Sequence, residues 1–283
     1  MKKSKLAYYA PKAVIVIVVL FASLLCLFPF YWMILNSFKQ PLDIFKVPVD
    51  LFTTNLTWAS YQAIFAYGDG LIWKAFLNSF IIASLSTLGT LFTSSMAAFA
   101  FAKLHFKGQK IWYGLFVSTL MVPGQVTLLP LFMVFSTIGW TDTFLPLIVP
   151  GVMINTYGVF LLRSFMVSLP DELLDAAKVD GCGFFRQYWN IILPLSKASL
   201  VTLGLFSFIG SWNNYFGQLI YLTNENLITM PLFIAGLKET HMTGIEWGRI
   251  MAASTLSILP IGIIYLSCQK YFVQGIATTG MKE

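Results

Sequence analysis

Six long apolar runs, almost free of charge, constrain the fold of this chain more than any other feature of its sequence. Each run is close to the roughly 20 residues that a helix needs to cross about 30 Å of hydrocarbon. The six runs are 13–38, 75–102, 111–136, 143–163, 198–222 and 250–270. We therefore predict an all-α membrane protein with six transmembrane helices, in which residues 1–283 form a single transmembrane domain.

The composition agrees with a membrane protein and not with a soluble domain. Only 11% of the 283 residues are charged, whereas a typical soluble domain carries about 25%. The net charge of +6 comes from Lys and Arg scattered between the apolar runs, without the basic stripe of a nucleic-acid-binding surface. The three cysteines are far apart in the sequence, which predicts neither a disulfide framework nor a metal site.

The distribution of basic residues predicts the orientation in the membrane. Cytoplasmic segments are enriched in Lys and Arg. If the N-terminus is placed inside, 13 of the 18 Lys and Arg residues fall in inner segments. We therefore predict that both termini are cytoplasmic.

The sequence lacks the residues and motifs that would couple transport to an energy source or catalyse a reaction. Ion-coupled carriers usually hold ionisable residues at membrane depth, but the six runs contain none except Arg163 and Lys270 at their ends. There is no glycine-rich phosphate loop and no HExxH or CxxC motif. His105 and His241 fall on opposite sides of the predicted membrane. We expect no catalytic residue, no metal site, and a pathway whose energy comes from another protein.

Uncharged polar side chains occur within the apolar runs. Amides offer hydrogen-bond donors and acceptors, and aromatic faces offer flat apolar contact, a mixture that suits a polyhydroxylated ligand such as a sugar. Hydrogen bonding between helices is an equally good explanation. The candidate pathway residues are Gln125, Asn155, Tyr157, Trp212, Asn213, Asn214, Tyr215 and Gln218.

Prolines and small residues indicate how the helices pack. Breaks such as those at Pro123 and Pro150 free backbone groups that need partners inside the protein or a water-lined cavity, which predicts bent helices around a pathway. The second run carries Ser94, Ala98 and Ala102 at helical spacing. Such a row lets helices approach closely, either within the chain or at a contact with another subunit.

Residues 164–197, here called the polar segment, are the exception in this apolar chain. We expect a first helix with Ser168 as its N-cap and with Asp171 and Glu172 in its first turn, where the helix dipole favours acids. Gly181 stands where a left-handed helix stop is expected, and a second, aromatic-rich helix follows. Two short helices joined at a glycine indicate a docking element for a grooved partner. A helix pair on the membrane surface is the alternative, although such helices are usually basic.

The polar segment carries the pattern Asp175-Ala176-Ala177-x3-Gly181-x9-Ile191-x-Leu193-Pro194. This pattern resembles the EAA loop of binding-protein-dependent ABC importer permeases. The one departure is Asp175, where the family usually has Glu, so that the charge is kept on a shorter side chain. Other stretches of the chain resemble, more weakly, the carbohydrate-type permeases. These are related to the second, shorter permease of the maltose system.

The resemblance implies a type I ABC importer permease fold with a cytoplasmic pair of coupling helices in a bacterial-type inner membrane. It also implies the residues that contact the ATPase, namely Asp171, Glu172, Asp175, Ala176, Ala177, Gly181, Ile191, Leu193 and Pro194. The implied partners are a second homologous permease, two ABC ATPase subunits that bind ATP and Mg, and an extracytoplasmic solute-binding protein. The chain itself would bind no cofactor and form half of the pathway for a sugar or oligosaccharide. The alternatives are a glycerol-3-phosphate-type permease and, from another class, an ion-coupled secondary transporter.

Overall fold

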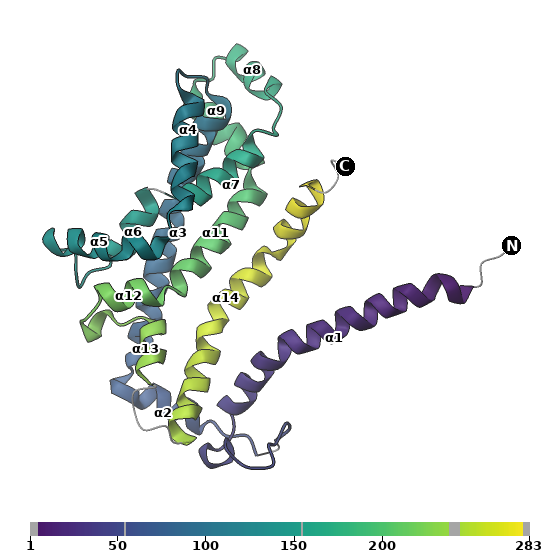
Figure 1. The fold of residues 1–283 in the computed structure, drawn as a ribbon, viewed down its shortest axis with the longest axis vertical. Helices are drawn as coiled ribbons and strands as arrows, with labels where there is room; N and C mark the ends of the chain where they lie inside the picture. Colours follow the sequence, from purple (N-terminus) through teal and green to yellow (C-terminus); the bar gives the residue numbers. More distant parts are fainter. Residues whose placement is uncertain (1–4, 54, 154, 238–243, 280–283) are drawn as a thin grey trace. The chain divides into compact units, whose positions relative to one another are not determined.

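The computed structural model describes residues 5–53, 55–153, 155–237 and 244–279, and every regular element among them is a helix (Figure 1). The elements before residue 140 are α1 (Lys5–Ser37), η1 (Pro41–Asp43), α2 (Ala59–Ala66), η2 (Tyr67–Asp69), α3 (Leu71–Lys103), α4 (Gln109–Ser118), η3 (Thr119–Met121) and α5 (Gly124–Thr137). Those after it are α6 (Leu145–Met153), α7 (Thr156–Met166), α8 (Glu172–Val179), α9 (Phe184–Gln187), the π-helix η4 (Tyr188–Ile192), α10 (Leu193–Leu195), α11 (Lys197–Trp212), α12 (Tyr215–Tyr221), η5 (Glu225–Leu227), α13 (Met230–Gly236) and α14 (Gly244–Thr279). This architecture confirms the predicted all-α fold class.

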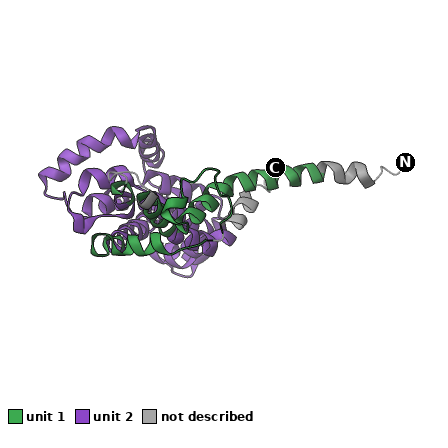
Figure 2. Ribbon diagram, turned by 90° about the horizontal axis from the view of Figure 1, so that it is seen from below, with its two compact units in different colours: residues 1–72, 234–258 green, residues 73–233, 259–283 purple. Residues whose placement is uncertain are grey.

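The chain forms two compact units (Figure 2). Unit 1 contains residues 1–72 and 234–258, and unit 2 contains residues 73–233 and 259–283. The single transmembrane domain expected from the sequence remains a prediction.

Four segments are individually long and apolar enough to cross a membrane, namely Lys12–Ser37, Leu71–Lys103, Leu145–Met166 and Glu246–Tyr271. Two bent helix pairs also qualify, namely Gln109–Met121 with Gly124–Thr137 and Phe184–Leu195 with Lys197–Trp212. The predicted number of six is reached when each bent pair counts as one span.

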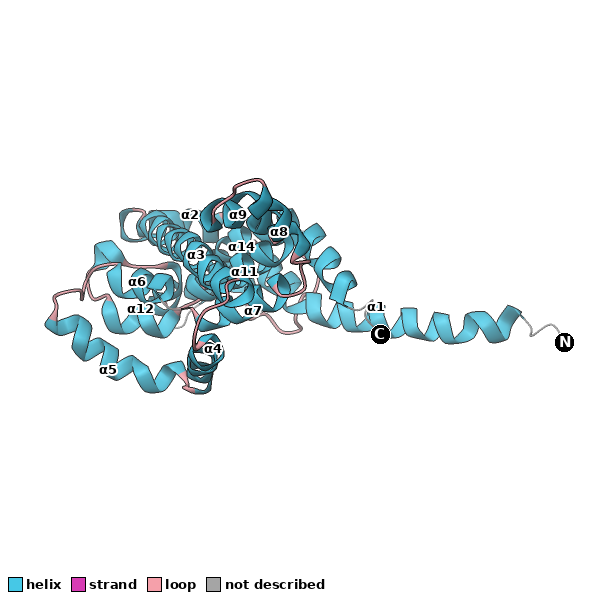
Figure 3. Ribbon diagram, turned by 90° about the horizontal axis from the view of Figure 1, so that it is seen from above, coloured by secondary structure: helices cyan, strands magenta, loops and turns pink. Residues whose placement is uncertain are grey.

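The third predicted span, 111–136, is not one continuous helix. The chain bends by 96° between Gln109–Met121 and Gly124–Thr137 (Figure 3). Pro123 lies at the bend with extended backbone angles, φ −63° and ψ 131°. Because proline has no N–H and its ring clashes with the preceding helical turn, α4 and η3 cannot continue through this position.

In unit 1, a buried lysine fixes the loop that follows α1. Lys39 is 1% exposed. Its Nζ donates a hydrogen bond to the carbonyl oxygen of Asp50 at 2.7 Å and lies 4.7 Å from the centroid of the Trp32 ring. These contacts offset the cost of burying an ammonium group and hold the loop against the end of α1.

In unit 2, α3 supplies hydrogen bonds to the broken helix formed by α6 and α7. Gly151 and Val152 lie in the last turn of α6, where carbonyl groups have no partner within the helix. Thr90 Oγ1 donates to the Gly151 carbonyl at 3.0 Å, and Thr93 Oγ1 donates to the Val152 carbonyl at 2.6 Å. The expectation that freed backbone groups find partners inside the protein is confirmed here.

The small residues of α3 serve packing within the chain. Ser94 and Ala98 are buried in the isolated chain. A Cβ atom added to Gly158 of α7 would lie 2.7 Å from Ser94 Oγ, closer than real Cβ contacts come. The row was expected to pack closely either within the chain or against another subunit. The structure confirms the packing within the chain.

Candidate functional site

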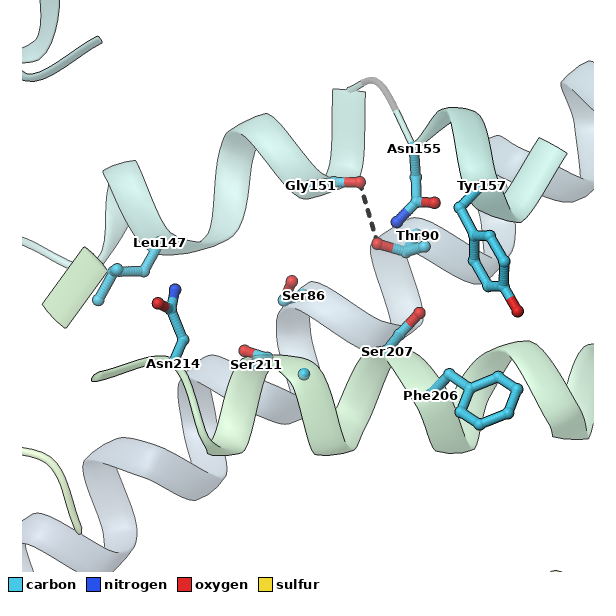
Figure 4. A pocket seen from close by; sticks show the side chains of 11 residues that line it. Ser86, Thr90, Leu147, Gly151, Asn155, Tyr157, Phe206, Ser207, Ser211 and Asn214 are labelled. Atoms are coloured by element: carbon cyan, nitrogen blue, oxygen red, sulfur yellow. Dashed lines mark hydrogen bonds between the residues drawn. The ribbon is translucent and has the colours of Figure 1, made fainter. Parts of the chain in front are cut away.

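A cavity of about 310 Å³ lies in unit 2 between α3, α6, α7, α11 and the residue before α12 (Figure 4). It is lined by Ser86, Thr90, Leu147, Gly151, Asn155, Tyr157, Phe206, Ser207, Gly210, Ser211 and Asn214. Hydroxyl and amide groups therefore alternate with two aromatic rings, and none of the lining residues is charged at neutral pH.

Two asparagines of the cavity wall have the same structural role. Asn155 is the N-cap of α7, and its Oδ1 accepts a hydrogen bond from the Gly158 N–H at 2.7 Å. Asn214 is the N-cap of α12, and its Oδ1 accepts from the Gly217 N–H at 3.1 Å. Among the described residues, neither Nδ2 group has a hydrogen-bond partner. N-capping thus orients both amides while leaving their donors available beside the cavity (Figure 4).

Three of the eight candidate pathway residues line the cavity, namely Asn155, Tyr157 and Asn214. Two others are completely buried and take part in packing. Trp212 lies between Phe76 and Phe208, with ring centroids 5.4 and 5.8 Å away.

Gln218 is the second of these buried residues. Its Oε1 accepts a hydrogen bond from Thr229 Oγ1, and its Nε2 donates to the Ser211 carbonyl at 3.5 Å. Its amide is therefore used in connecting α12 to the neighbouring segments of unit 2.

The remaining candidates lie outside the cavity. Asn213 is exposed at the end of α11, Tyr215 is half-buried in α12 with its ring against Phe216, and Gln125 is exposed in α5. A pathway role for these residues remains a prediction.

The sequence interpretation missed the hydroxyl groups that form most of the polar wall. Ser86 and Thr90 lie four residues apart on α3, and Ser207 and Ser211 lie four residues apart on α11. Residues at this spacing share one face of a helix. The two pairs were therefore detectable as polar faces of apolar helices.

The polar segment forms the second candidate site, and its glycine stop is as expected. Gly181 has a φ of +76°, which confirms the left-handed conformation after α8. The expected cap at Ser168 is wrong, since α8 begins at Glu172 and the Ser168 hydroxyl donates to the Phe165 carbonyl at 2.7 Å. This hydroxyl satisfies a carbonyl at the end of α7 and is not available to α8.

The two faces of α8 have different surroundings. Leu174 and Ala177 are buried, and Leu174 belongs to the core cluster around Phe99 and Met166. Glu172, Asp175 and Ala176 are exposed, and Asp175 accepts a hydrogen bond from Lys178 at 2.8 Å. One face therefore anchors the helix and the other is exposed.

Three further apolar side chains of the polar segment are exposed. Val179 is 89% exposed, and Phe184 and Phe185 are 61% and 64% exposed. They were not among the predicted contact residues, although two adjacent Phe residues in a polar segment are a signal that the sequence contains.

The last predicted contact residues lie in or directly after a widened helical turn. Pro194 lacks an N–H, and the π-helix η4 before it ends with the Leu193 N–H donating to the Tyr188 carbonyl. Ile191 and Leu193 are half-buried, whereas Pro194 is exposed. Tyr188 is buried, and its hydroxyl forms a 2.7 Å hydrogen bond with Ser95 Oγ of α3.

Asp171, at the N-cap position of α8, does not use its carboxylate to cap the helix. Its Oδ1 accepts a hydrogen bond from Lys103 Nζ at 2.6 Å. This hydrogen bond and the positive charge of Lys103 hold the pKa of Asp171 below its usual range.

Apolar helices of spanning length, a cavity with an uncharged polar wall, and a polar helix pair anchored to the far end of α3 are the features of a membrane permease. The chain belongs to the family described as "Binding-protein-dependent transport system inner membrane component", whose sequence model matches residues 89–278.

Curated relatives extend this similarity over most of the chain. The probable ABC transporter permease protein YurM of Bacillus subtilis (strain 168) is 34% identical over 90% of this chain and 83% of the relative. The arabinooligosaccharides transport system permease protein AraQ of the same organism is 31% identical over 92% of both chains. The sn-glycerol-3-phosphate transport system permease protein UgpE of Yersinia pestis bv. Antiqua (strain Antiqua) is 31% identical over 92% of this chain and 94% of the relative.

A solved structure shows the same fold. It is a chain of a bacterial ABC transporter involved in the import of the acidic polysaccharide alginate, with a TM-score of 0.80 at 22% identity. The match covers 96% of this chain and 99% of that chain.

The double role of Asn155 generates a testable prediction. Ser is as good an N-cap as Asn, so Asn155→Ser keeps the cap of α7 but removes the Nδ2 donor from the cavity. We expect Asn155→Ser to lower solute uptake without changing the thermal stability of the purified complex. Asn155→Ala, which removes the cap as well, should also destabilise the protein by about 1 kcal/mol.

Asn224→Ser is the control, because the side-chain oxygen of Asn224 also caps a helix, by accepting from the Asn226 N–H at the start of η5, but Asn224 does not line the cavity. Uptake by Asn155→Ser equal to uptake by Asn224→Ser would reduce Asn155 to a helix cap.

Proposed function

We propose that this chain is the permease subunit of an ATP-driven ABC importer and forms half of the membrane pathway for a sugar or oligosaccharide. The observation that carries this proposal is the wall of the cavity. Hydroxyl and amide groups can exchange hydrogen bonds with a polyhydroxylated solute, and Tyr157 and Phe206 offer flat surfaces to its apolar faces. The names of relatives such as AraQ support the same class of solute.

A second candidate function is transport of sn-glycerol-3-phosphate, since UgpE is as similar to this chain as AraQ is. A phosphate group is bound most strongly by Arg, Lys or metal ions. Among the residues that the structure describes, no cationic side chain lines the cavity. Its chemistry therefore favours a neutral solute.

The polar segment is the surface through which the ATPase acts. This segment exposes the acidic side chains of Glu172 and Asp175 together with the apolar residues Val179, Phe184 and Phe185. Exposed apolar patches with a polar rim are typical of protein–protein contacts. We assign this surface to an ABC ATPase, which binds ATP and Mg²⁺ itself.

The complete importer contains two such ATPases, a second homologous permease and an extracytoplasmic solute-binding protein. Both termini and the polar segment are on the cytoplasmic side, in agreement with the excess of Lys and Arg in the inner segments. The apolar residues 14–21 of α1 are exposed in the isolated chain and would contact lipid or the second permease.

The solute class is tested by uptake into proteoliposomes that contain the complex purified through this chain, with ATP inside and the binding protein outside. We expect ATP-dependent uptake of a labelled neutral oligosaccharide that is insensitive to ionophores and is not inhibited by glycerol-3-phosphate. Uptake of glycerol-3-phosphate alone would favour the second candidate, and uptake driven by an ion gradient without ATP would refute an ABC importer.

The docking surface is tested by placing a charge on it. Val179→Asp should leave the fold intact, because the side chain is 89% exposed, but should lower ATPase co-purification and uptake. Val47→Asp is the matched control, since Val47 is 88% exposed and lies outside the polar segment. Equal amounts of co-purified ATPase in the two variants would exclude Val179 from the docking surface.

A further inference from the structure

Lys103, the last residue of α3, has a charged side chain in an unusually buried place. Its side chain is only 2% exposed. Burying an ammonium group is costly unless its hydrogen bonds and charge are satisfied. Nζ donates to the Leu169 carbonyl and to Asp171 Oδ1, both at 2.6 Å.

Both acceptors belong to the short link between α7 and α8. Leu169 and Asp171 lie on either side of Pro170, and Asp171 is the residue immediately before α8. The ammonium group therefore holds the start of α8 against the end of α3. The side chain of Asp171 is 72% exposed, so the ion pair joins a buried base to a solvent-exposed acid.

Helix α3 also contacts the second helix of the polar segment. Ser95 hydrogen-bonds Tyr188, and the Phe99 ring lies 5.6 Å from the Tyr188 ring. Among the described residues, the contact of Lys103 with Asp171 is the only ion pair between α3 and the polar segment.

The same helix forms part of the cavity wall. Ser86 and Thr90 line the cavity, and α3 runs without proline from Thr90 to Lys103. At 1.5 Å per residue this distance is about 20 Å along the helix axis. One uninterrupted helix thus connects the start of α8 to the wall of the cavity.

We propose that Lys103 is a positioning residue that fastens α8 to α3, so that a displacement of α8 is passed to the cavity wall. The claim that movement of α8 reaches the cavity wall rests on the proposed function, in which the ATPase displaces α8. The fastening itself is a property of this chain and can be measured without transport.

Lys103→Met is the informative substitution. Methionine keeps the apolar stem of the side chain, and removing the charge also removes the cost of burying it. Asp171 is exposed and remains hydrated when its partner is lost. The fold should therefore persist, while α8 keeps its apolar contact through Leu174 and loses its ionic link to the end of α3.

Two variants serve as controls. Lys103→Arg keeps the charge and its donors, and should keep the link. Lys110→Met makes the same change at an exposed lysine of α4, which has no ion pair among the described residues.

The first measurement uses the full chain in lipid nanodiscs, with its cysteines Cys26, Cys182 and Cys268 replaced by alanine. Spin labels on cysteines introduced at Leu88 of α3 and Val179 of α8, both well exposed, report the distance between the helices. We expect Lys103→Met to broaden this distance distribution, and Lys103→Arg and Lys110→Met to leave it as in the parent.

The second measurement is the amount of solute taken up per ATP hydrolysed by the unlabelled complex. Single substitutions along a coupling network typically change the coupling by a factor of roughly 2 to 30, so we expect Lys103→Met to lower this ratio severalfold while thermal stability and ATPase co-purification are retained. A variant that is merely less stable would lose uptake and hydrolysis together.

An unchanged distance distribution in Lys103→Met overturns the proposal whatever happens to uptake. If Lys103→Met takes up as much solute per ATP hydrolysed as the parent, the claim that a displacement of α8 is passed to the cavity wall is overturned. A parent complex without ATP-driven uptake, combined with a broadened distribution in Lys103→Met, refutes the proposed function and supports the fastening of α8 by Lys103.

Discussion

The structure of unit 2 depends on one constraint, which is that a helix broken at membrane depth must find partners for its freed backbone groups. The side chains of α3 meet this requirement. Thr90 and Thr93 donate to the carbonyls at the end of α6. Toward the other end of α3, Asn78 donates to two carbonyls near η5, and Ser79 accepts the N–H of Met230. A continuous helix with small polar side chains thus stabilises the interruptions of its neighbours.

The same interruptions create the candidate pathway. Where α6 ends and α7 begins, the chain needs an N-cap, and Asn155 supplies it. Where α11 ends and α12 begins, Asn214 does the same. Because each cap uses only the amide oxygen, the Nδ2 groups of both asparagines remain beside the cavity as donors. A structural requirement of broken helices therefore also provides polar groups for a solute.

Much of this organisation could be predicted from the sequence because it depends on local rules. Charge-free runs of spanning length predicted the helical membrane fold, and the spacing around Gly181 predicted its left-handed conformation. Whether a single side chain points into the cavity or into the packed interior could not be predicted in this way. Trp212 and Gln218 look like pathway residues in the sequence, but packing against Phe76 and hydrogen bonding with Thr229 place them in the interior.

The central claim is that the cavity of this chain belongs to an ATP-driven pathway, and the reactivity of a cysteine at Ser207 tests it directly. In the reconstituted complex, without other cysteines in this chain, the rate of labelling by a membrane-impermeant thiol reagent is measured from each side of the membrane. The account predicts that ATP and the binding protein shift this reactivity from one side to the other, whereas a cysteine at Ser118, outside the cavity, stays unchanged. Labelling of the Ser207 position from the same side and at the same rate with and without ATP would contradict it.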